Sequence, residues 1–269
     1  MFNTTIATQI YAKICFEATN SQKKIIENLS EYLSDDDFSR IFVLNGFAGT
    51  GKTTLIAAVV AALKELRIKP VLLAPTGRAA KVLARYCGEQ ALTIHKRIYR
   101  QRTNADYESK FSLDFNREQG AVFIVDEASM LSDSTGDGAL FGSGSLLEDL
   151  VSYVRSGRGC RLILVGDSAQ LPPVGCDFSP ALDPATVSRY GEVVYGLMDE
   201  VVRQQMQSGI LFNATLVRCM LENRIYEIPK FEMDYPDFES VEGGDFMEKL
   251  QDAFDRYGRD EVIVITRSN

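Results

Sequence analysis

Residues 41–60, "IFVLNGFAGTGKTTLIAAVV", carry the strongest structural signal in this chain of 269 residues. The stretch begins with a short apolar run, continues through a glycine-rich loop and ends in a run of helix-forming residues. This order predicts a buried strand, a tight loop and a helix. Glycines let the backbone N–H groups of such a loop converge on phosphate oxygens, and the positive end of the helix dipole adds to the attraction. The stretch therefore predicts a phosphate-binding loop.

The loop matches the spacing G-x-x-x-x-G-K-T, between a predicted strand and a predicted helix. The ammonium group of Lys52 is expected to reach the β- and γ-phosphates of a nucleotide, and the Thr53 hydroxyl is expected to ligate Mg²⁺. The predicted nucleotide contacts within the loop are Gly46, Ala48, Gly49, Thr50, Gly51, Lys52, Thr53 and Thr54.

Strand-like and helix-like segments alternate along the rest of the chain, which predicts an α/β fold with a mostly parallel sheet and helices on both faces. The strand-like segments are near-continuous apolar runs, as expected for strands buried on both faces. The predicted strands are 41–45, 70–74, 121–126, 161–167 and 261–266, and the predicted helices are 20–33, 52–67, 78–87, 145–155 and 210–222. Residues 98–115 interrupt this rhythm with two β-prone arms around a polar tip, and they predict an inserted β-hairpin.

Polar side chains follow two of the predicted strands, where an open α/β sheet builds its site. Asp126 and Glu127 follow "VFIV". Asp126 can hold Mg²⁺ through water, and Glu127 can orient or polarise an attacking water. Gln170, in "GDSAQLPPVG", can donate to a γ-phosphate or to water, although glutamine is also an ordinary residue of polar turns.

Two further residues are weaker candidates when taken alone. Arg203, in "EVVRQQ", could stabilise a transferred phosphoryl group as an arginine finger, but a surface arginine is the plainer interpretation. Gln22 follows the helix caps expected at Asn20 or Ser21. Its amide both donates and accepts, which matches adenine, but a solvated glutamine in the first turn is the plainer interpretation when the residue is taken alone.

The net charge of −8 is unevenly distributed along the chain. Residues 222–261 contain 13 acidic and 5 basic side chains, so they account for all of it. Residues 78–102 contain 7 basic side chains and one acidic side chain, a local charge of +6. Such a patch suits a polyanion, although a solvated basic face is the competing interpretation.

Composition excludes several classes of protein. No apolar run reaches the roughly 18 to 20 residues that a membrane span needs, and the first residues lack a signal-peptide pattern, so a cytoplasmic protein is expected. The 5 cysteines have no zinc or disulfide spacing, and the single histidine makes a His-ligated metal site an unfavoured interpretation.

Taken together, the motifs resemble those of a superfamily 1 DNA helicase of the RecD-like and Dda-like branch. The resemblance covers nearly all of residues 15–205. It rests on Gln22 and on the segments "GFAGTGKT", "APTGRAAKVL", "TIHK", "VDEASM", "GDSAQLPPVG" and "VVRQ". It implies the first of two RecA-like motor domains, with ATP and Mg²⁺ as cofactors and movement from 5′ to 3′ along single-stranded DNA.

The same resemblance implies roles for particular residues. Arg203 matches the arginine finger, and with Lys52, Asp126, Glu127 and Gln170 it completes the expected catalytic set. The implied DNA contacts fall in the basic patch and are Thr76, Arg78, Lys81, His95, Lys96 and Arg97. The 98–115 hairpin occupies the place of the family's strand-separating pin, and its aromatic residues are expected to serve mainly as packing; they are Tyr99, Tyr107, Phe111 and Phe115.

The resemblance also predicts a domain plan. Residues 1–97 and 116–225 would form the motor domain, 98–115 the pin, 226–260 an acidic connection and 261–269 the start of a truncated second RecA-like domain. Robust unwinding is not expected without that second domain. Two alternatives stay open, namely a P-loop switch that binds nucleic acid without translocation and a binding scaffold with a vestigial site.

Overall fold

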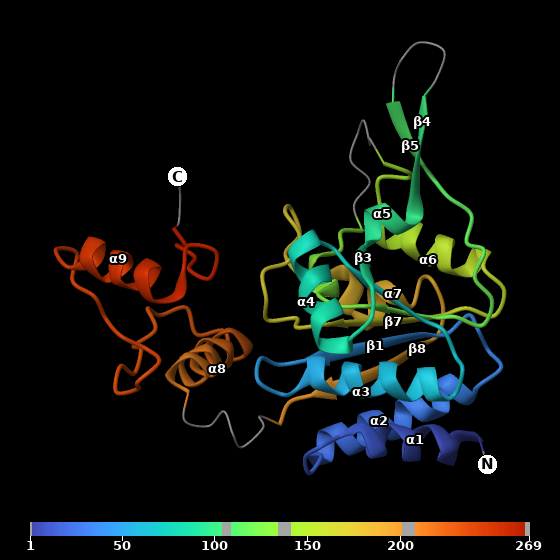
Figure 1. The fold of residues 1–269 in the computed structure, drawn as a ribbon, viewed down its shortest axis with the longest axis horizontal. Coiled ribbons are helices and arrows are strands. Elements are labelled where there is room, and N and C mark those ends of the chain that lie inside the picture. Colours follow the sequence, from blue (N-terminus) through green and yellow to red (C-terminus); the bar gives the residue numbers. More distant parts are fainter. Residues whose placement is uncertain (1, 104–108, 134–140, 201–207, 267–269) are drawn as a thin grey trace. The chain divides into compact units, whose positions relative to one another are not determined.

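A six-stranded parallel sheet forms the core of residues 1–203 in this computed structural model, in which residues 2–103, 109–133, 141–200 and 208–266 are described (Figure 1). The strand order is β3-β2-β6-β7-β1-β8, and every strand pair in this sheet is parallel. The strands are β1 (Ile41–Gly46), β2 (Pro70–Ala74), β3 (Ala91–Thr93), β6 (Val122–Val125), β7 (Arg161–Gly166) and β8 (Val193–Met198). Because all six are parallel, their carboxyl ends meet along one edge of the sheet.

Helices cover both faces of this sheet, as the sequence predicts (Figure 1). Alternate residues of β1 face opposite sides, so Phe42 and Leu44 join one core cluster while Ile41 and Val43 join the other. Each fully buried aliphatic side chain stabilises the folded state by about 1.5–3 kcal/mol, because its apolar surface is removed from water. The first cluster includes residues of α1 (Phe2–Lys13), α2 (Asn20–Ser34), α3 (Lys52–Glu65) and α4 (Gly77–Cys87). The second includes residues of α5 (Ile94–Ile98), η1 (Ala128–Met130), α6 (Leu146–Ser156), η2 (Pro180–Leu182) and α7 (Pro184–Val187).

The inserted hairpin is present and confirms its prediction. Strands β4 (Tyr99–Thr103) and β5 (Ser109–Leu113) pair antiparallel, while residues 104–108 at the tip, including Tyr107, lie outside the described residues. Phe111 stacks on Phe141 with ring centroids 4.5 Å apart, and Tyr99 is buried at the base of the hairpin. The prediction of a packing role is wrong for Phe115, which is 63% exposed.

Several elements differ from the predicted pattern. The edge strands β3 and β8 and the first helix α1 were not predicted. Strand β8 has the apolar sequence "VVYGLM", interrupted only by Gly196, so the sequence did carry a strand signal there; at the edge of the sheet only Gly196 and Met198 of this strand are buried. Residues 261–266 form no strand, and Ile263 and Ile265 are exposed. A strand needs a hydrogen-bonded neighbour, and no strand among the described residues pairs with this apolar run.

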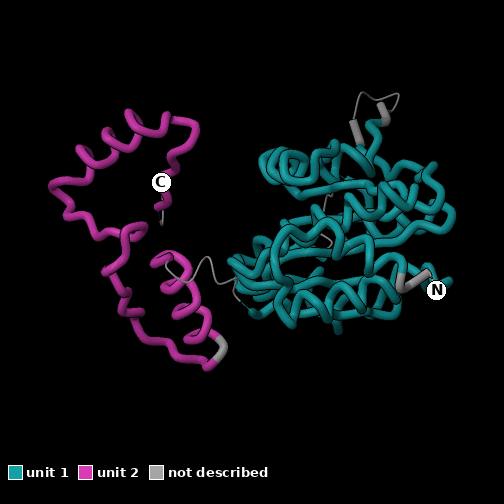
Figure 2. Tube along the Cα trace, turned by 60° about the horizontal axis from the view of Figure 1, so that its bottom comes forward, with its two compact units in different colours: residues 1–203 teal, residues 204–269 magenta. Residues whose placement is uncertain are grey.

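Contacts divide the chain into two units, residues 1–203 and residues 204–269 (Figure 2). The second unit contains α8 (Gly209–Glu222) and α9 (Phe246–Tyr257). Asn213 of α8 is buried and hydrogen-bonds Glu232 at both the backbone N–H and the carbonyl, which fixes the following segment against the helix. The helix predicted at 210–222 as part of the motor domain therefore belongs to the second unit. Among the described residues, none of the helices has both the length and the apolar content needed to cross a membrane.

Candidate nucleotide site and nucleic-acid interface

The predicted phosphate loop joins the end of β1 to the start of α3. Gly49 and Gly51 have φ angles of 76° and 83°, in the left-handed region that favours glycine. Gly46 is required for a different reason, because a Cβ atom there would lie 2.8 Å from both Cγ and Cδ of Lys52. These three positions permit a loop whose backbone curls around the lysine, and they fit the cradle that a phosphate group needs.

Lys52 is held inside this loop. Its Nζ donates to the carbonyl oxygens of Gly46 and Phe47, the latter at 3.0 Å, and lies 4.0 Å from Oδ2 of Asp167. The side chain is only 16% exposed. Because the cation is already fixed at the mouth of the loop, little conformational entropy would be lost when it binds a phosphate. Thr53 follows at the first turn of α3, half-buried, with a hydroxyl group suited to Mg²⁺.

Asp126 and Glu127 occupy the end of β6, as expected. Glu127 has a φ of 55°, a conformation that is unfavourable for a residue with a side chain, and its backbone N–H donates to Oδ1 of Asp126 at 3.0 Å. Burial raises the pKa of Asp126, and the neighbouring Glu127 carboxylate raises it further, while the Glu127 N–H and Lys52 oppose the rise. A divalent cation beside Asp126 would favour its charged form, so the carboxylate and the Thr53 hydroxyl form a donor set that fits Mg²⁺.

Gln170 is hydrogen-bonded to Ser129, which follows the acidic pair by two residues and was not predicted as a site residue. The Ser129 hydroxyl, fully buried in η1, donates to Oε1 of Gln170 at 3.1 Å. This bond leaves the Gln170 amide nitrogen as the group that can donate to a γ-phosphate or to water. The place of Ser129 two residues after Glu127 was the only sequence signal for it.

Asn45, which was not predicted as a site residue, links the end of β1 to the segment that follows β7 by hydrogen bonds. Its Nδ2 donates to Oγ of Ser168 at 2.8 Å and to the hydroxyl of Tyr195 at 3.0 Å, and its Oδ1 accepts from the backbone N–H of Ser168 at 3.0 Å. The side chain therefore fixes the start of the Gln170 loop against the strand that precedes the phosphate loop.

Gln22 does not have the environment that the sequence predicts. The cap of α2 is Thr19, not Asn20 or Ser21, and its hydroxyl accepts from the Gln22 backbone N–H while Gln22 Oε1 accepts from the Thr19 backbone N–H at 3.0 Å. Gln22 Nε2 donates to the Thr50 carbonyl at 2.9 Å, and the side chain is fully buried. In this position the amide braces the phosphate loop, so contact with an adenine would need it to turn out of the capping box.

The predicted DNA contacts on α4 fall into two kinds. Thr76 caps the helix, because its hydroxyl accepts from the Ala79 backbone N–H at 3.2 Å. Arg78 and Lys81 are exposed, and within the described part of the chain neither takes part in an ion pair. These two cations are therefore available to a polyanion.

The contacts predicted on α5 also differ among themselves. Lys96 is exposed. Arg97 instead forms an ion pair with Glu118 at 2.6 Å, and Lys69 contacts the other oxygen of the same carboxylate at 2.8 Å. Burial alone would raise the pKa of Glu118, but the hydrogen bonds from Lys69 and Arg97 lower it below its usual value. Arg97 therefore already has an anionic partner, which the sequence prediction did not include.

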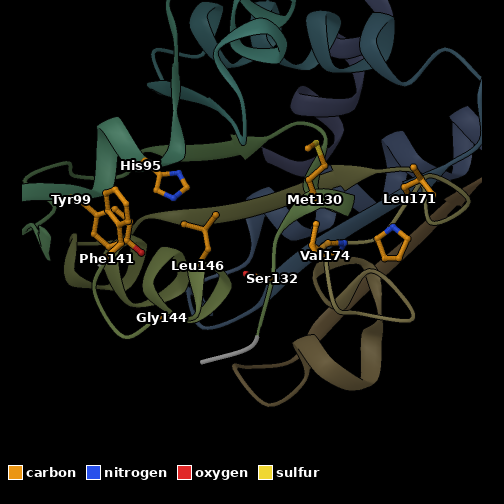
Figure 3. A pocket seen from close by; sticks show the side chains of 11 residues that line it. His95, Tyr99, Met130, Ser132, Phe141, Gly144, Leu146, Leu171 and Val174 are labelled. Atoms are coloured by element: carbon orange, nitrogen blue, oxygen red, sulfur yellow. The ribbon is translucent and has the colours of Figure 1, made fainter. Parts of the chain in front are cut away.

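His95 borders a cavity of about 570 Å³ beside the base of the hairpin (Figure 3). Its ring lies edge-on to Phe141 at 5.1 Å and near Tyr99 at 5.7 Å, and burial lowers its pKa. Figure 3 shows the His95, Tyr99 and Phe141 rings on one side of the cavity, and Met130, Leu171 and Val174 on the other. Leu171 and Val174 are almost fully exposed, so this wall is apolar surface open to a ligand.

The geometry thus brings together Lys52, Asp126, Asp167 and the Ser129–Gln170 pair at one edge of the sheet. Arg203 lies outside the described residues, so its predicted role as an arginine finger stays a prediction.

Comparison with known proteins identifies the family of this chain. The sequence profile of the AAA_30 family, an AAA domain, matches residues 17–212. The chain belongs to that family. It is 31% identical over 154 residues to the ATP-dependent RecD2 DNA helicase of Deinococcus radiodurans, covering 57% of this chain and 19% of that protein. It is 34% identical over 136 residues to the ATP-dependent DNA helicase dda of Enterobacteria phage T4, covering 49% of this chain and 28% of that protein.

These relatives confirm the resemblance to the RecD-like and Dda-like helicases, and the chain spans less than a third of the length of either. A structure of the Pif1 helicase from Bacteroides, in complex with ADP-AlF3 and ssDNA, has the same fold. The superposition has a TM-score of 0.50 at 18% identity and covers 92% of this chain and 58% of that one. The predicted α/β RecA-like P-loop fold is therefore confirmed.

Proposed function

We propose that this chain is the ATP-binding motor domain of a DNA helicase that couples ATP hydrolysis to movement along single-stranded DNA. One observation carries the proposal. The phosphate loop, the Asp126–Glu127 pair and the Ser129–Gln170 pair follow the carboxyl ends of the neighbouring strands β1, β6 and β7, in a chain whose relatives are ATP-dependent DNA helicases.

The proposed roles follow from the position of each group. Lys52 and the loop N–H groups bind the phosphates, while Thr53 and Asp126 hold Mg²⁺, which neutralises phosphate charge when bound. Glu127 orients the attacking water. Gln170, held through its Oε1, senses the γ-phosphate with its amide nitrogen. By resemblance to the family, Arg203 stabilises the transferred phosphoryl group. Gln22, which the resemblance places at the adenine, is proposed instead to stay in its capping box and hold the phosphate loop through Thr50.

Single-stranded DNA is proposed to follow the face that carries Arg78, Lys81 and Lys96. Cations along such a groove neutralise phosphates, and aromatic or apolar surface accommodates bases without reading their sequence. The cavity beside His95 offers that apolar surface. Movement from 5′ to 3′, a role in repair or recombination and a second RecA-like domain that closes over the nucleotide are further parts of the proposal, taken from the family resemblance.

The test begins with the binding of fluorescent mant-ATP and of a labelled oligothymidylate to residues 1–269. Micromolar nucleotide binding that requires Lys52, with slow hydrolysis, is the expected result. ATP hydrolysis and unwinding of duplexes with 5′ or 3′ tails are then measured in a protein extended by the second domain, with Lys52→Ala as the control.

The outcomes separate the alternatives. Stimulation of hydrolysis by single-stranded DNA supports the motor, and preference for the 5′ tail supports the proposed direction. Nucleotide-dependent DNA binding without stimulated hydrolysis would instead indicate the P-loop switch. Strong DNA-stimulated hydrolysis by residues 1–269 alone would contradict the need for a second domain.

A further inference from the structure

The end of β8 is connected to the phosphate loop by two separate routes of hydrogen bonds, one direct and one through α2. The direct route is a backbone hydrogen bond of 3.0 Å, in which the Phe47 N–H donates to the Met198 carbonyl. It extends the parallel pairing of β1 with β8, in which Gly46 lies opposite Met198. The indirect route begins two residues later, at Glu200.

Glu200 binds the first turn of α2 with both carboxylate oxygens. The backbone N–H of Asn20 donates to Oε2 and that of Ser21 donates to Oε1, each at 3.1 Å. These are N–H groups at a helix start, which have no partner within the helix, and a negative charge there is further stabilised by the helix dipole. The carboxylate therefore fixes where α2 begins relative to β8.

From this helix start, the route continues to the phosphate loop through buried groups. The Thr19–Gln22 capping box fixes the Gln22 amide, and Gln22 Nε2 donates to the Thr50 carbonyl at 2.9 Å. The Thr50 hydroxyl in turn donates to the Phe47 carbonyl at 2.7 Å, the same oxygen that accepts from Lys52 Nζ. Each bond in this sequence restrains the next group toward Lys52.

We propose that Glu200 is a positioning residue for the phosphate loop. Its carboxylate holds the start of α2, and thereby Gln22 against Thr50, so that removing it weakens nucleotide binding although Glu200 lies outside the phosphate loop. We call this connection, from Glu200 through the α2 start and Gln22 to Thr50, the Glu200 clasp. The part of this proposal that concerns nucleotide affinity rests on the proposed function, whereas the part that concerns the loop does not.

A simple helix cap is the competing role, and it predicts a different result. A cap stabilises the first turn of its helix, and its loss frays that helix start. If Glu200 acts only as a cap, the backbone at the start of α2 frays while the buried Gln22 side chain keeps its bond to Thr50, so the loop around residues 47–52 does not change. The clasp requires that both regions respond to the same substitution.

The experiment measures hydrogen–deuterium exchange and mant-ADP affinity in residues 1–269, for the wild type, Glu200→Ala, Glu200→Gln and Asp199→Asn. Asp199→Asn is the matched control, because it removes one negative charge from the neighbouring exposed residue, for which no hydrogen bond or ion pair is found among the described residues. We expect Glu200→Ala to accelerate exchange in both 19–26 and 47–52 and to raise the Kd for mant-ADP about tenfold, within the usual range of coupling between sites. Glu200→Gln keeps one accepting oxygen and should give an intermediate effect, while Asp199→Asn should match the wild type.

A double-mutant cycle with Gln22→Leu tests whether the two residues belong to one connection. Gln22→Leu removes the bond to Thr50, so adding Glu200→Ala should cause little further acceleration at 47–52. Faster exchange confined to 19–26 with unchanged mant-ADP affinity, or additive effects in the cycle, would overturn the proposal. If the wild type does not bind mant-ADP, the proposed function fails, but exchange at 47–52 still decides whether the clasp exists.

Discussion

Two groups of charged side chains in the first unit contrast with each other. At the phosphate-loop edge, Lys52 and Asp167 have only 16% and 3% of their side chains exposed, and each is fixed by its surroundings. On the face of α4 and α5, Arg78, Lys81 and Lys96 are exposed. Buried charges lose hydration and must be positioned before a ligand arrives, whereas exposed charges keep their hydration and attract a polyanion over a distance. The first region is therefore suited to a reaction at a fixed position, and the second to binding a nucleic-acid strand that moves across it.

The largest effect is expected from Lys52→Ala. Removing a fixed charge from a buried site costs about 10²–10³ in rate when that charge stabilises a transition state. We expect ATP hydrolysis to fall by about 10³ and mant-ATP affinity to fall strongly, with oligothymidylate binding nearly unchanged. A loss of DNA affinity as large as the loss of nucleotide affinity would break the distinction between the two regions.

Asp126→Asn is expected to reduce hydrolysis by about 10² while raising the melting temperature. Its pKa is raised in the folded protein, so the charged carboxylate costs stability at neutral pH. The sign follows from proton binding: stability falls as pH rises from the ordinary Asp value through the raised folded pKa, and the cost remains above it. The melting-temperature gain of Asp126→Asn should therefore be larger at pH 7 than at pH 4.

Differential scanning calorimetry at both pH values checks this prediction. Asp177→Asn is a matched control, because it removes the same charge from an exposed position. A lower melting temperature for Asp126→Asn at pH 7 would show that the carboxylate is stabilised by its surroundings and would weaken its assignment to a desolvated metal site.

The exposed region predicts a smaller effect that depends on salt. Arg78→Ala and Lys81→Ala should each reduce affinity for oligothymidylate several-fold at low salt, with little change in mant-ATP affinity. Each phosphate contact that is lost from a single strand reduces the slope of log K against log salt by about 0.7. Titrations at several salt concentrations measure this slope, with the exposed Arg117→Ala as a charge-matched control outside the basic patch. An unchanged slope would place the DNA path elsewhere.

The smallest effect, a reduced free energy of unfolding, is expected for Arg97→Ala. Its ion pair with Glu118 is partly buried, with side chains 25% and 17% exposed, and should contribute about 1 kcal/mol or less. Because the pKa of Glu118 is lowered, this contribution is present at neutral pH and is lost as pH falls through the folded pKa.

Chemical unfolding at pH 7 and at acidic pH measures the Arg97 contribution, and Lys96→Ala serves as the neighbouring comparison in DNA binding. If Arg97→Ala weakens DNA binding more than Lys96→Ala does, Arg97 leaves Glu118 to contact DNA, and the prediction from the sequence was right.

Local patterns in the sequence were sufficient for the phosphate loop, the central strands and the hairpin. Glycine spacing and apolar runs act over a few neighbouring residues, so their consequences can be inferred without knowing the fold. The edge strand β8 was not predicted although its sequence, "VVYGLM", is apolar, and its place in the sheet follows from its pairing with β1. The apolar run 261–266 shows the converse, since a strand-like sequence forms no strand without a neighbour.

The candidate site residues Lys52, Asp126, Glu127 and Gln170 were predicted from motif spacing, and the fold places them along one edge of the sheet. Their partners did not follow from the sequence. Ser129 meets Gln170 across 41 residues, Gln22 meets Thr50 across 28, and Glu200 meets the start of α2 across 180. These contacts depend on the order in which strands assemble into the sheet, and side-chain chemistry alone does not specify that order. The chain's residue pattern thus predicts where a nucleotide binds, whereas the assembled sheet determines which groups hold that candidate site in place.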